Sequence, residues 1–216
     1  MKLYYFAGAC SLSPHITLRE SGLPFDLAKV DVKTRTLVSD GTPYTNIQPL
    51  NYVPLLELDD GTRLSEGPAI VQYIADKVPA KKLAPPNGTP ERYKLQSWLG
   101  FINSELHKGI AVLFNFPVDE TAKEAMRTKL KRPLGWLDEQ LAKSPYLMGA
   151  DFTVADAYLY TVTMPYRAKR ATVDLSPYKN LKAFRDRVDT RPSVKAAMAA
   201  EGITAEHGVN QPQPQK

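Results

Sequence analysis

The sequence is poor in cysteine and histidine. Cys10 is the single cysteine among 216 residues, which excludes a disulfide within the chain and any cysteine-rich metal site. The three histidines, His15, His107 and His207, are far apart in the sequence. We therefore expect no metal site.

Long apolar runs and blocks of like charge are also missing. No apolar stretch approaches the roughly 20 residues that cross a membrane, and no charged-then-apolar leader precedes the first strand. The chain has 28 Lys and Arg against 23 Asp and Glu, a net charge of +5. These basic residues are spread along the chain and form no nucleic-acid-binding arm. We expect a cytoplasmic protein that binds small molecules, not a membrane or nucleic acid.

The first part of the chain has the pattern of a small α/β domain. Apolar runs, turn residues and one helical period give the order strand, helix, strand, turn, strand, strand, helix, in a mixed sheet covered by helices. Pro54 should stand at a strand start and is a candidate for a cis peptide bond. The predicted elements are a strand at 3–6, a helix ending at Gly22, a strand at 25–32, a turn or weak helix at 42–49, a hairpin at 52–64 and a helix capped by Ser65.

Everything after a proline-rich stretch at 79–90 is predicted to be helical. Thr153 and Asp156 form a predicted capping box. Pro133 should kink or interrupt one helix and Pro165 should kink or shorten another. The predicted helices span 92–114, 120–142, 155–170, 178–190 and 193–200. We therefore predict domains at 1–78 and 91–203, a linker at 79–90 and a disordered tail at 204–216.

Cys10 lies at a predicted strand-to-helix turn, after Gly8 and before Ser11, Ser13 and Pro14. Serine and proline here are typical of a helix N-terminus, whose free N–H groups and dipole favour a thiolate and bind anions. The competing interpretation of a lone cysteine is a small buried hydrophobic residue. Since no second thiol is available, a mixed disulfide at Cys10 needs an exogenous thiol to resolve it.

Several segments together resemble the cytosolic glutathione transferases, and the bacterial beta class most. They are YYFAGACSLSPHITLRESG at 4–22, YVPLL at 52–56, LDDGTRLSEGPAIVQYIAD at 58–76, SELHKG at 104–109 and FTVADAYLY at 152–160. The resemblance covers residues 1 to about 203. It implies a thioredoxin-like N-terminal domain, an all-α C-terminal domain, and a homodimer that binds glutathione as cosubstrate.

The resemblance also implies roles for particular residues. Cys10 and His107 would be catalytic, with Tyr5 or Ser11 as an alternative hydroxyl donor to the glutathione thiolate. His15 should be structural, as should Thr153 and Asp156. Glu66 and His107 have the alternative interpretation of ordinary helix residues. The other glutathione-binding residues would be Tyr52, Val53 and Pro54 along the tripeptide backbone, Ser65, Glu66 and Gly67 at the γ-glutamyl group, Arg35 or Lys33 at the glycyl carboxylate, and Lys108 beside His107.

Three functions follow from this resemblance. The first is conjugation of glutathione to small hydrophobic electrophiles, as in detoxification. A cysteine S–H is a weak hydrogen-bond donor, which motivates the second, a glutathione-dependent thiol–disulfide reductase that acts through a mixed disulfide on Cys10. The third is a non-catalytic ligand-binding dimer that keeps only the fold.

Overall fold

The computed structural model describes residues 1–204 and 206, and its N-terminal part contains one four-stranded sheet. The strand order is β2-β1-β3-β4. β1 pairs in parallel with β2, whereas the β1–β3 and β3–β4 pairs are antiparallel. The predicted mixed sheet is therefore confirmed. Its strands are β1 (Lys2–Tyr5), β2 (Asp26–Lys29), β3 (Leu55–Glu57) and β4 (Arg63–Ser65).

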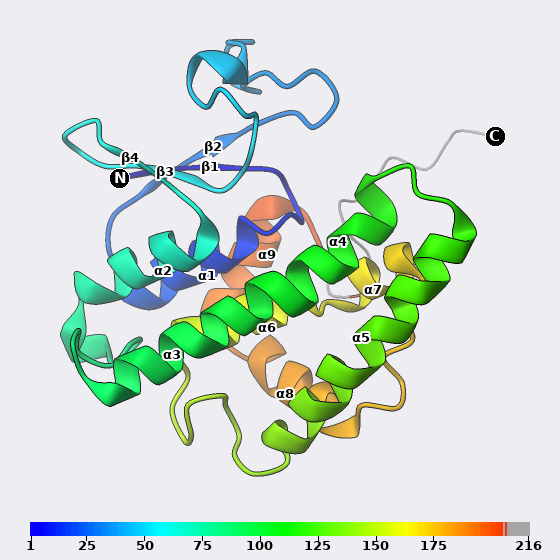
Figure 1. The fold of residues 1–216 in the computed structure, drawn as a ribbon. Coiled ribbons are helices and arrows are strands. Elements are labelled where there is room, and N and C mark those ends of the chain that lie inside the picture. Colours follow the sequence, from blue (N-terminus) through cyan, green and yellow to red (C-terminus); the bar gives the residue numbers. More distant parts are fainter. Residues whose placement is uncertain (205, 207–216) are drawn as a thin grey trace.

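The two faces of the sheet are covered differently. Helices α1 (Leu12–Ser21) and α2 (Gly67–Asp76) lie on one face, and the loop around the short 3₁₀ helix η1 (Tyr44–Asn46) lies on the other (Figure 1). Side chains alternate along a strand. Leu3 accordingly packs in the core with α1 and α2, and Tyr4 packs in the core with Tyr44.

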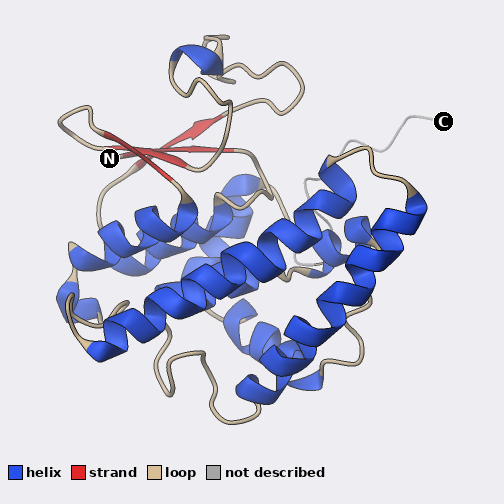
Figure 2. Cartoon of the chain, in the orientation of Figure 1, coloured by secondary structure: helices blue, strands red, loops and turns tan. Residues whose placement is uncertain are grey.

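The rest of the described chain is helical, as predicted (Figure 2). Its largest hydrophobic core also takes in apolar side chains of α1 and α2, so the helical part packs directly beneath the sheet part. The further helices are η2 (Pro79–Lys81), α3 (Pro90–Phe101), η3 (Ile102–His107), α4 (Lys108–Asn115), α5 (Glu120–Leu141), α6 (Val154–Val162), α7 (Pro165–Ala171), α8 (Lys179–Asp189) and α9 (Pro192–Glu201).

One long predicted helix contains an unexpected irregularity. α3, η3 and α4 follow one another without a break, but η3 is a π-helical segment. A π-helical turn shifts the facing of the residues that follow it, and such turns are frequent at functional sites. The segment ends at His107, one of the predicted site residues. No feature of the residue pattern distinguished the η3 segment from an ordinary α-helix.

The proline predictions have different outcomes. α6 ends before Pro165, and this proline opens α7 at the position where its missing N–H costs nothing. Pro133 lies inside α5 without interrupting it. The capping box of Thr153 and Asp156 is present at the start of α6, which confirms their structural role.

The serines predicted to cap two helices differ in outcome. α1 begins at Leu12 with Ser11 as N-cap, but the Ser11 hydroxyl donates to the Phe6 carbonyl, 3.1 Å away, and caps nothing. Ser65 is the last residue of β4, so the N-cap of α2 is Glu66. The predicted start of α1 at Ser11 is confirmed, although the Ser11 hydroxyl makes no capping hydrogen bond. The predicted cap at Ser65 is wrong, because Ser65 is paired in β4.

Among the described residues, no helix is both long enough and apolar enough to pass through a lipid bilayer. The predicted tail at 204–216 lies almost wholly outside the described residues. The proposed domain limits stay a prediction.

Candidate functional site

The sulfur of Cys10 lies in the short loop between β1 and α1. The thiol donates a hydrogen bond to the backbone carbonyl of Val53, with Sγ and O 3.3 Å apart. The peptide bond from Val53 to Pro54 is cis, as predicted. Cys10 is half-buried as a residue, and its role at the site stays a prediction. The structure thus brings together the predicted thiol and the predicted peptide-binding strand edge.

The electrostatic setting of Cys10 differs from the expected one. Burial raises the pKa of the Cys10 thiol, because the charged form loses solvation, and the Glu66 carboxylate adds to this effect. The charges of Arg167 and Lys108 oppose it. The helix N-terminus alone therefore does not produce a thiolate here, contrary to the sequence-based expectation.

Gly8, two residues before Cys10, is held from both sides of its peptide by the helical part of the chain. Its N–H donates to Oε2 of Glu201 in α9 at 2.9 Å, and its carbonyl accepts from the Tyr166 hydroxyl and from Nη1 of Arg167, both in α7. The backbone of Gly8 has φ of +71°, and a Cβ there would lie 3.0 Å from the Tyr166 oxygen. Only glycine meets both requirements without strain. The loop that carries Cys10 is thus fixed by residues more than 150 positions away.

His107 takes part in a chain of hydrogen bonds at the end of η3. Its Nδ1 lies 2.8 Å from the Tyr158 hydroxyl, which donates to Oδ1 of Asn103 at 2.9 Å. Since the hydroxyl proton goes to Asn103, Nδ1 of His107 donates and Nε2 is left as an acceptor. Burial and the nearby charges of Arg167 and Lys108 lower the pKa of His107 to about 3. His107 is therefore neutral at pH 7.

A second cluster stands at the start of α2. Glu66 is exposed, has φ of +67° and makes no capping hydrogen bond. The N–H groups of the first turn of α2, which begins at Gly67, are available to an anion. Nearer the Cys10 loop, the Arg35 guanidinium lies 5.0 Å from the ring centre of Phe6. Lys33, two residues before Arg35 in the same loop, is exposed.

Comparison with known proteins identifies the family. Residues 7–77 match the model described as "Glutathione S-transferase, N-terminal domain", and residues 104–201 match "Glutathione S-transferase, C-terminal domain". The chain belongs to the glutathione S-transferase family. Glutathione S-transferase GstA of Escherichia coli O157:H7 is 44% identical over 204 residues, which cover 94% of this chain and all of the relative.

Two solved glutathione S-transferases resemble this chain in structure. A beta-class glutathione S-transferase of Sphingomonas chungbukensis is 45% identical, with a TM-score of 0.87, over 94% of this chain and all of the other. A sphingomonad glutathione S-transferase complexed with glutathione is 41% identical, with the same TM-score and the same coverage. The sequence-based resemblance to the beta class is therefore confirmed.

Two predicted residues of this glutathione S-transferase do not reach the Cys10 loop surface. Ser11 is fully buried and its hydroxyl is used by Phe6. Tyr5 is 5% exposed and faces the same side of the sheet as Leu3, with its ring 6.2 Å from that of His15. The period of two along β1 was the signal for this, since Tyr5 and Leu3 must share a face.

His15 has the predicted structural role. It is fully buried in α1, its Nδ1 lies 2.8 Å from Oε1 of Glu201, and its Nε2 accepts from Nε of Arg19. The third histidine, His207, lies outside the described residues.

Sequence reasoning missed the residues of the helical part that hold Gly8 or form hydrogen bonds around His107. Arg167, Tyr166 and Glu201 lie in helices with no motif of their own. Tyr158 lies inside the quoted FTVADAYLY segment, and Asn103 immediately precedes SELHKG. For Tyr158 and Asn103, the position in or beside a recognisable segment was the only signal. That signal did not indicate the hydrogen bonds to His107.

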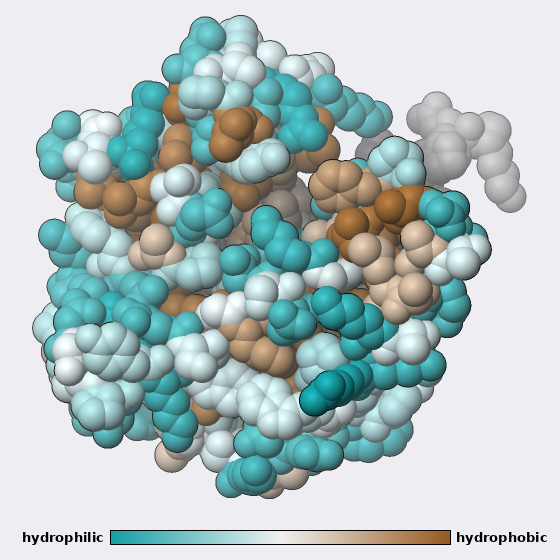
Figure 3. All heavy atoms as spheres, viewed as in Figure 1, coloured by the Kyte–Doolittle hydropathy of each residue, from teal (hydrophilic) through white to brown (hydrophobic). Residues whose placement is uncertain are grey.

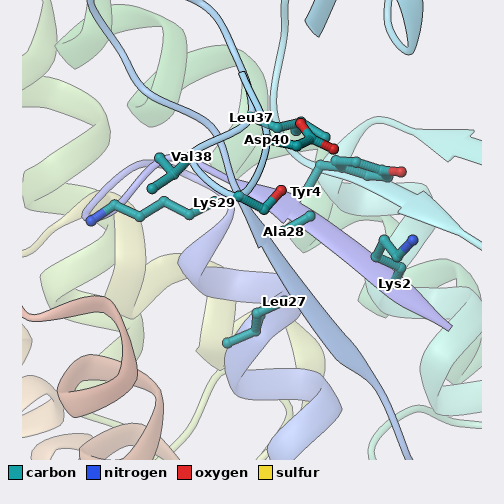
Figure 4. A pocket seen from close by; sticks show the side chains of 9 residues that line it. Lys2, Tyr4, Leu27, Ala28, Lys29, Leu37, Val38 and Asp40 are labelled. Atoms are coloured by element: carbon teal, nitrogen blue, oxygen red, sulfur yellow. The ribbon is translucent and has the colours of Figure 1, made fainter. Parts of the chain in front are cut away.

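Two hollows in the described part of the chain lie away from Cys10. One, of about 420 Å³, is lined by residues of β1, β2 and the loop at 37–40, and Figure 4 shows Tyr4, Leu37 and Asp40 around it. The other, of about 700 Å³, lies between the linker and residues 148–153. Neither is lined by a predicted site residue, so they give no support to a different active site.

Proposed function

We propose that this protein conjugates glutathione to small hydrophobic electrophiles at the Cys10 loop. The observation that carries the proposal is the 3.3 Å contact between the Cys10 sulfur and the Val53 carbonyl. A tripeptide that pairs its backbone with the strand edge at Val53 would bring its own sulfur beside Cys10. The sphingomonad relative complexed with glutathione supports this choice of cosubstrate.

The charged ends of glutathione have matching partners. The γ-glutamyl carboxylate would bind at the N-terminus of α2, around Ser65 and Gly67, where free N–H groups and the helix dipole favour an anion. Glu66, which is exposed and makes no capping bond, would hold the γ-glutamyl amine. Arg35, already stacked on Phe6, is better placed than Lys33 to bind the glycyl carboxylate. Tyr52 and Pro54 would flank the pairing segment.

The reaction transfers a sulfur nucleophile. The glutathione thiolate attacks an electrophilic carbon, the C–S bond forms, and the leaving group departs with its electron pair. Positioning contributes most, because lowering a thiol pKa from about 8.5 to about 6.5 raises the thiolate fraction at pH 7 about 25-fold but loses about 8-fold in nucleophilicity. Neutral His107 would accept a hydrogen bond at Nε2 near the sulfur, and Lys108 would supply positive charge.

The electrophile would meet an apolar surface at the end of α4. Hydrophobic residues gather on the molecular surface where α4 passes to α5 (Figure 3), a connection that contains Phe116, which is 60% exposed. The neighbouring ring of Phe114 lies 5.7 Å from the Arg167 guanidinium. An apolar aryl group placed here would lie on the same side of the helical part as the Cys10 loop.

A thiol–disulfide reductase is the second candidate, favoured by the partial exposure of Cys10. The Cys10 thiolate would attack a disulfide, forming a mixed disulfide and releasing one thiolate. Glutathione thiolate would then attack that mixed disulfide, regenerating Cys10 and releasing a glutathione mixed disulfide. Glutathione is the reductant, and the electrons balance over the two exchanges.

Replacing Cys10 separates these functions. Cys10→Ala and Cys10→Ser are assayed for conjugation of an aryl halide and for reduction of a small disulfide, alongside retention on immobilised glutathione. We expect both variants to lose disulfide reduction and to keep conjugation. Loss of both reactions would contradict a division of roles. Wild-type protein that neither binds the column nor turns over an aryl halide would favour a ligand-binding protein and end the proposal.

Intact mass gives independent support for glutathione at Cys10. Purified wild-type protein incubated with oxidised glutathione should gain a glutathione-sized adduct that disappears after reductant, and Cys10→Ser should gain none. An adduct-free wild-type protein would count against contact between the tripeptide and the thiol.

We also propose a homodimer and a detoxifying role in the cytoplasm. Leu50 and Tyr52 are neighbouring apolar side chains that are 66% and 63% exposed, a pattern that favours burial against a partner. Light scattering should give twice the chain mass. Leu50→Glu should shift it towards the monomer, whereas Val38→Glu, at a similarly exposed position of 58%, should not. A monomeric wild type would contradict the dimer, and fractionation of cells would test the location.

A further inference from the structure

Arg167 is a buried cation with an unused donor. It is 6% exposed, and Nη1 donates to the Gly8 carbonyl at 3.3 Å. Its Nε is buried and has no hydrogen-bond partner among the described residues. No ion pair within the described part of the chain includes Arg167. Burying a charged group without a counter-charge is costly, so this arrangement points to an anion at the site.

Cys10 is the ionisable residue of the loop that Arg167 contacts. Arg167 contacts the loop two residues before Cys10, and it is the strongest of the charges that favour the Cys10 thiolate. Lys108 in α4 acts in the same direction and Glu66 at the start of α2 acts against it. Cys10 in turn is one cause, after burial, of the raised pKa of Tyr158 in α6. His107 is neutral and adds no charge.

We propose that Arg167 is the positioning residue that holds the Cys10 loop through Gly8 and stabilises anionic sulfur at this site. In the free protein that sulfur is Cys10 whenever its thiol loses its proton; burial raises the pKa of the thiol, and the Arg167 charge opposes that shift. The further statement that the same charge stabilises the bound glutathione thiolate rests on the proposed function. The Nε–H of Arg167 has no acceptor among the described residues, so part of the hydrogen-bonding capacity of this cation is unused.

The test measures the rate of Cys10 alkylation against pH in the folded, full-length protein. Iodoacetamide is the probe, and its methylene carbon accepts the sulfur electron pair as iodide leaves and the thiol proton goes to solvent. Since Cys10 is the only cysteine, mass spectrometry reports this site alone. No glutathione is needed.

Arg167→Met should raise the midpoint of the alkylation profile by about 1 pH unit, since a nearby opposite charge lowers a pKa by about 1 to 3 units. At pH 7 the thiolate fraction then falls about 10-fold, while the more basic sulfur gains about 3-fold in nucleophilicity, so the rate should fall about 3-fold. Arg167→Gln, which keeps an N–H donor for Gly8, should shift the midpoint in the same way. Arg167→Lys keeps the charge and should recover at least half of the shift.

Arg170→Met is the matched control. Arg170 lies in the same helix, stacks on the same Phe114 ring at 4.4 Å and is exposed. Its variant should leave the midpoint unchanged. Thermal unfolding of every variant checks that the fold is kept.

An unchanged midpoint in both neutral variants would overturn the proposal, even if the rate fell at every pH, because that result means a structural role alone. Retention of the wild type on immobilised glutathione tests the proposed function separately. A shifted midpoint in a protein that ignores glutathione would keep the role of Arg167 and reject the transferase proposal. An unshifted midpoint in a protein that binds glutathione would reject the role of Arg167 and keep the transferase proposal.

Discussion

Two buried carboxylates, Asp156 and Glu201, each organise the backbone around them, but over very different spans of sequence. Asp156 accepts from the N–H groups of Thr153 and Leu147 and from the Thr153 hydroxyl. Glu201 accepts from the N–H of Gly8, 193 residues away, and pairs with His15, 186 residues away. The first fixes the start of one helix. The second ties the Cys10 loop to the last helix, so it couples folding of the whole chain to the geometry of the site.

Asp156→Ala should be the more damaging change of the two. It leaves two buried N–H groups and a hydroxyl without an acceptor, and we expect a loss of about 4 kcal/mol in the free energy of unfolding. Urea denaturation measures it. Asp151→Ala, an exposed carboxylate in the same segment, should cost less than about 0.5 kcal/mol. If Asp156→Ala loses less free energy of unfolding than Glu201→Ala, the local carboxylate is not the more important of the two for stability.

Glu201→Ala should cost about 3 kcal/mol, since the Gly8 N–H and His15 each lose their partner in the interior. Unlike Asp156→Ala, it should also change the alkylation rate of Cys10 in the folded protein, because the loop backbone is released. An unchanged rate, measured well below the unfolding transition, would mean that Tyr166 and Arg167 hold the loop by themselves.

Gly8→Ala sharpens the comparison at the loop itself. Gly8 and Gly22 have nearly the same φ, +71° and +73°, but only at Gly8 would a Cβ meet a close neighbour. Both substitutions meet the left-handed strain of about 1 kcal/mol, and Gly8→Ala should lose about 2 kcal/mol in total. If urea denaturation gives the same loss of unfolding free energy for Gly8→Ala and Gly22→Ala, the Tyr166 side chain moves aside without destabilising the protein.

The pKa shifts of His107 and Asp156 should make the free energy of unfolding depend on pH in opposite directions. The folded pKa of His107 is about 3, below its unfolded value of 6.5, so its contribution to stability is lost as the pH falls from about 6.5. Burial raises the pKa of Asp156 to about 6, above its unfolded value of 3.8, so its contribution rises as the pH falls through the same range.

Comparing His107→Asn with the wild type isolates the first contribution. Between pH 6 and 4 the difference in slope of the unfolding free energy should approach one proton, about 1.4 kcal/mol per pH unit. Urea denaturation at each pH measures it. Identical slopes would mean that His107 is protonated in the folded protein.

Local signals accounted for what was predicted correctly. The capping box at Thr153, the end of α6 before Pro165 and the cis bond at Pro54 depend on neighbours within a few residues, which the sequence displays directly. Ser11 is the N-cap of α1, as its residue type suggests, but its hydroxyl donates to the Phe6 carbonyl and not to the helix. The cap predicted at Ser65 failed because Ser65 belongs to β4. Tyr5 shares a face of β1 with the buried Leu3, a constraint that the alternation of the strand contains and the family resemblance does not.

By itself, the sequence determined the order of elements, the family and the position of a single thiol at a strand-to-helix loop, since these depend on local pattern. Only the tertiary structure decided which charges face that thiol. Arg167, Tyr166 and Glu201 reach the loop across more than 150 residues of chain. The pKa of Cys10 follows from burial and from the charges of Arg167, Lys108 and Glu66. Solvation and Coulomb interactions depend on distance in space, and no periodicity along a chain encodes that distance.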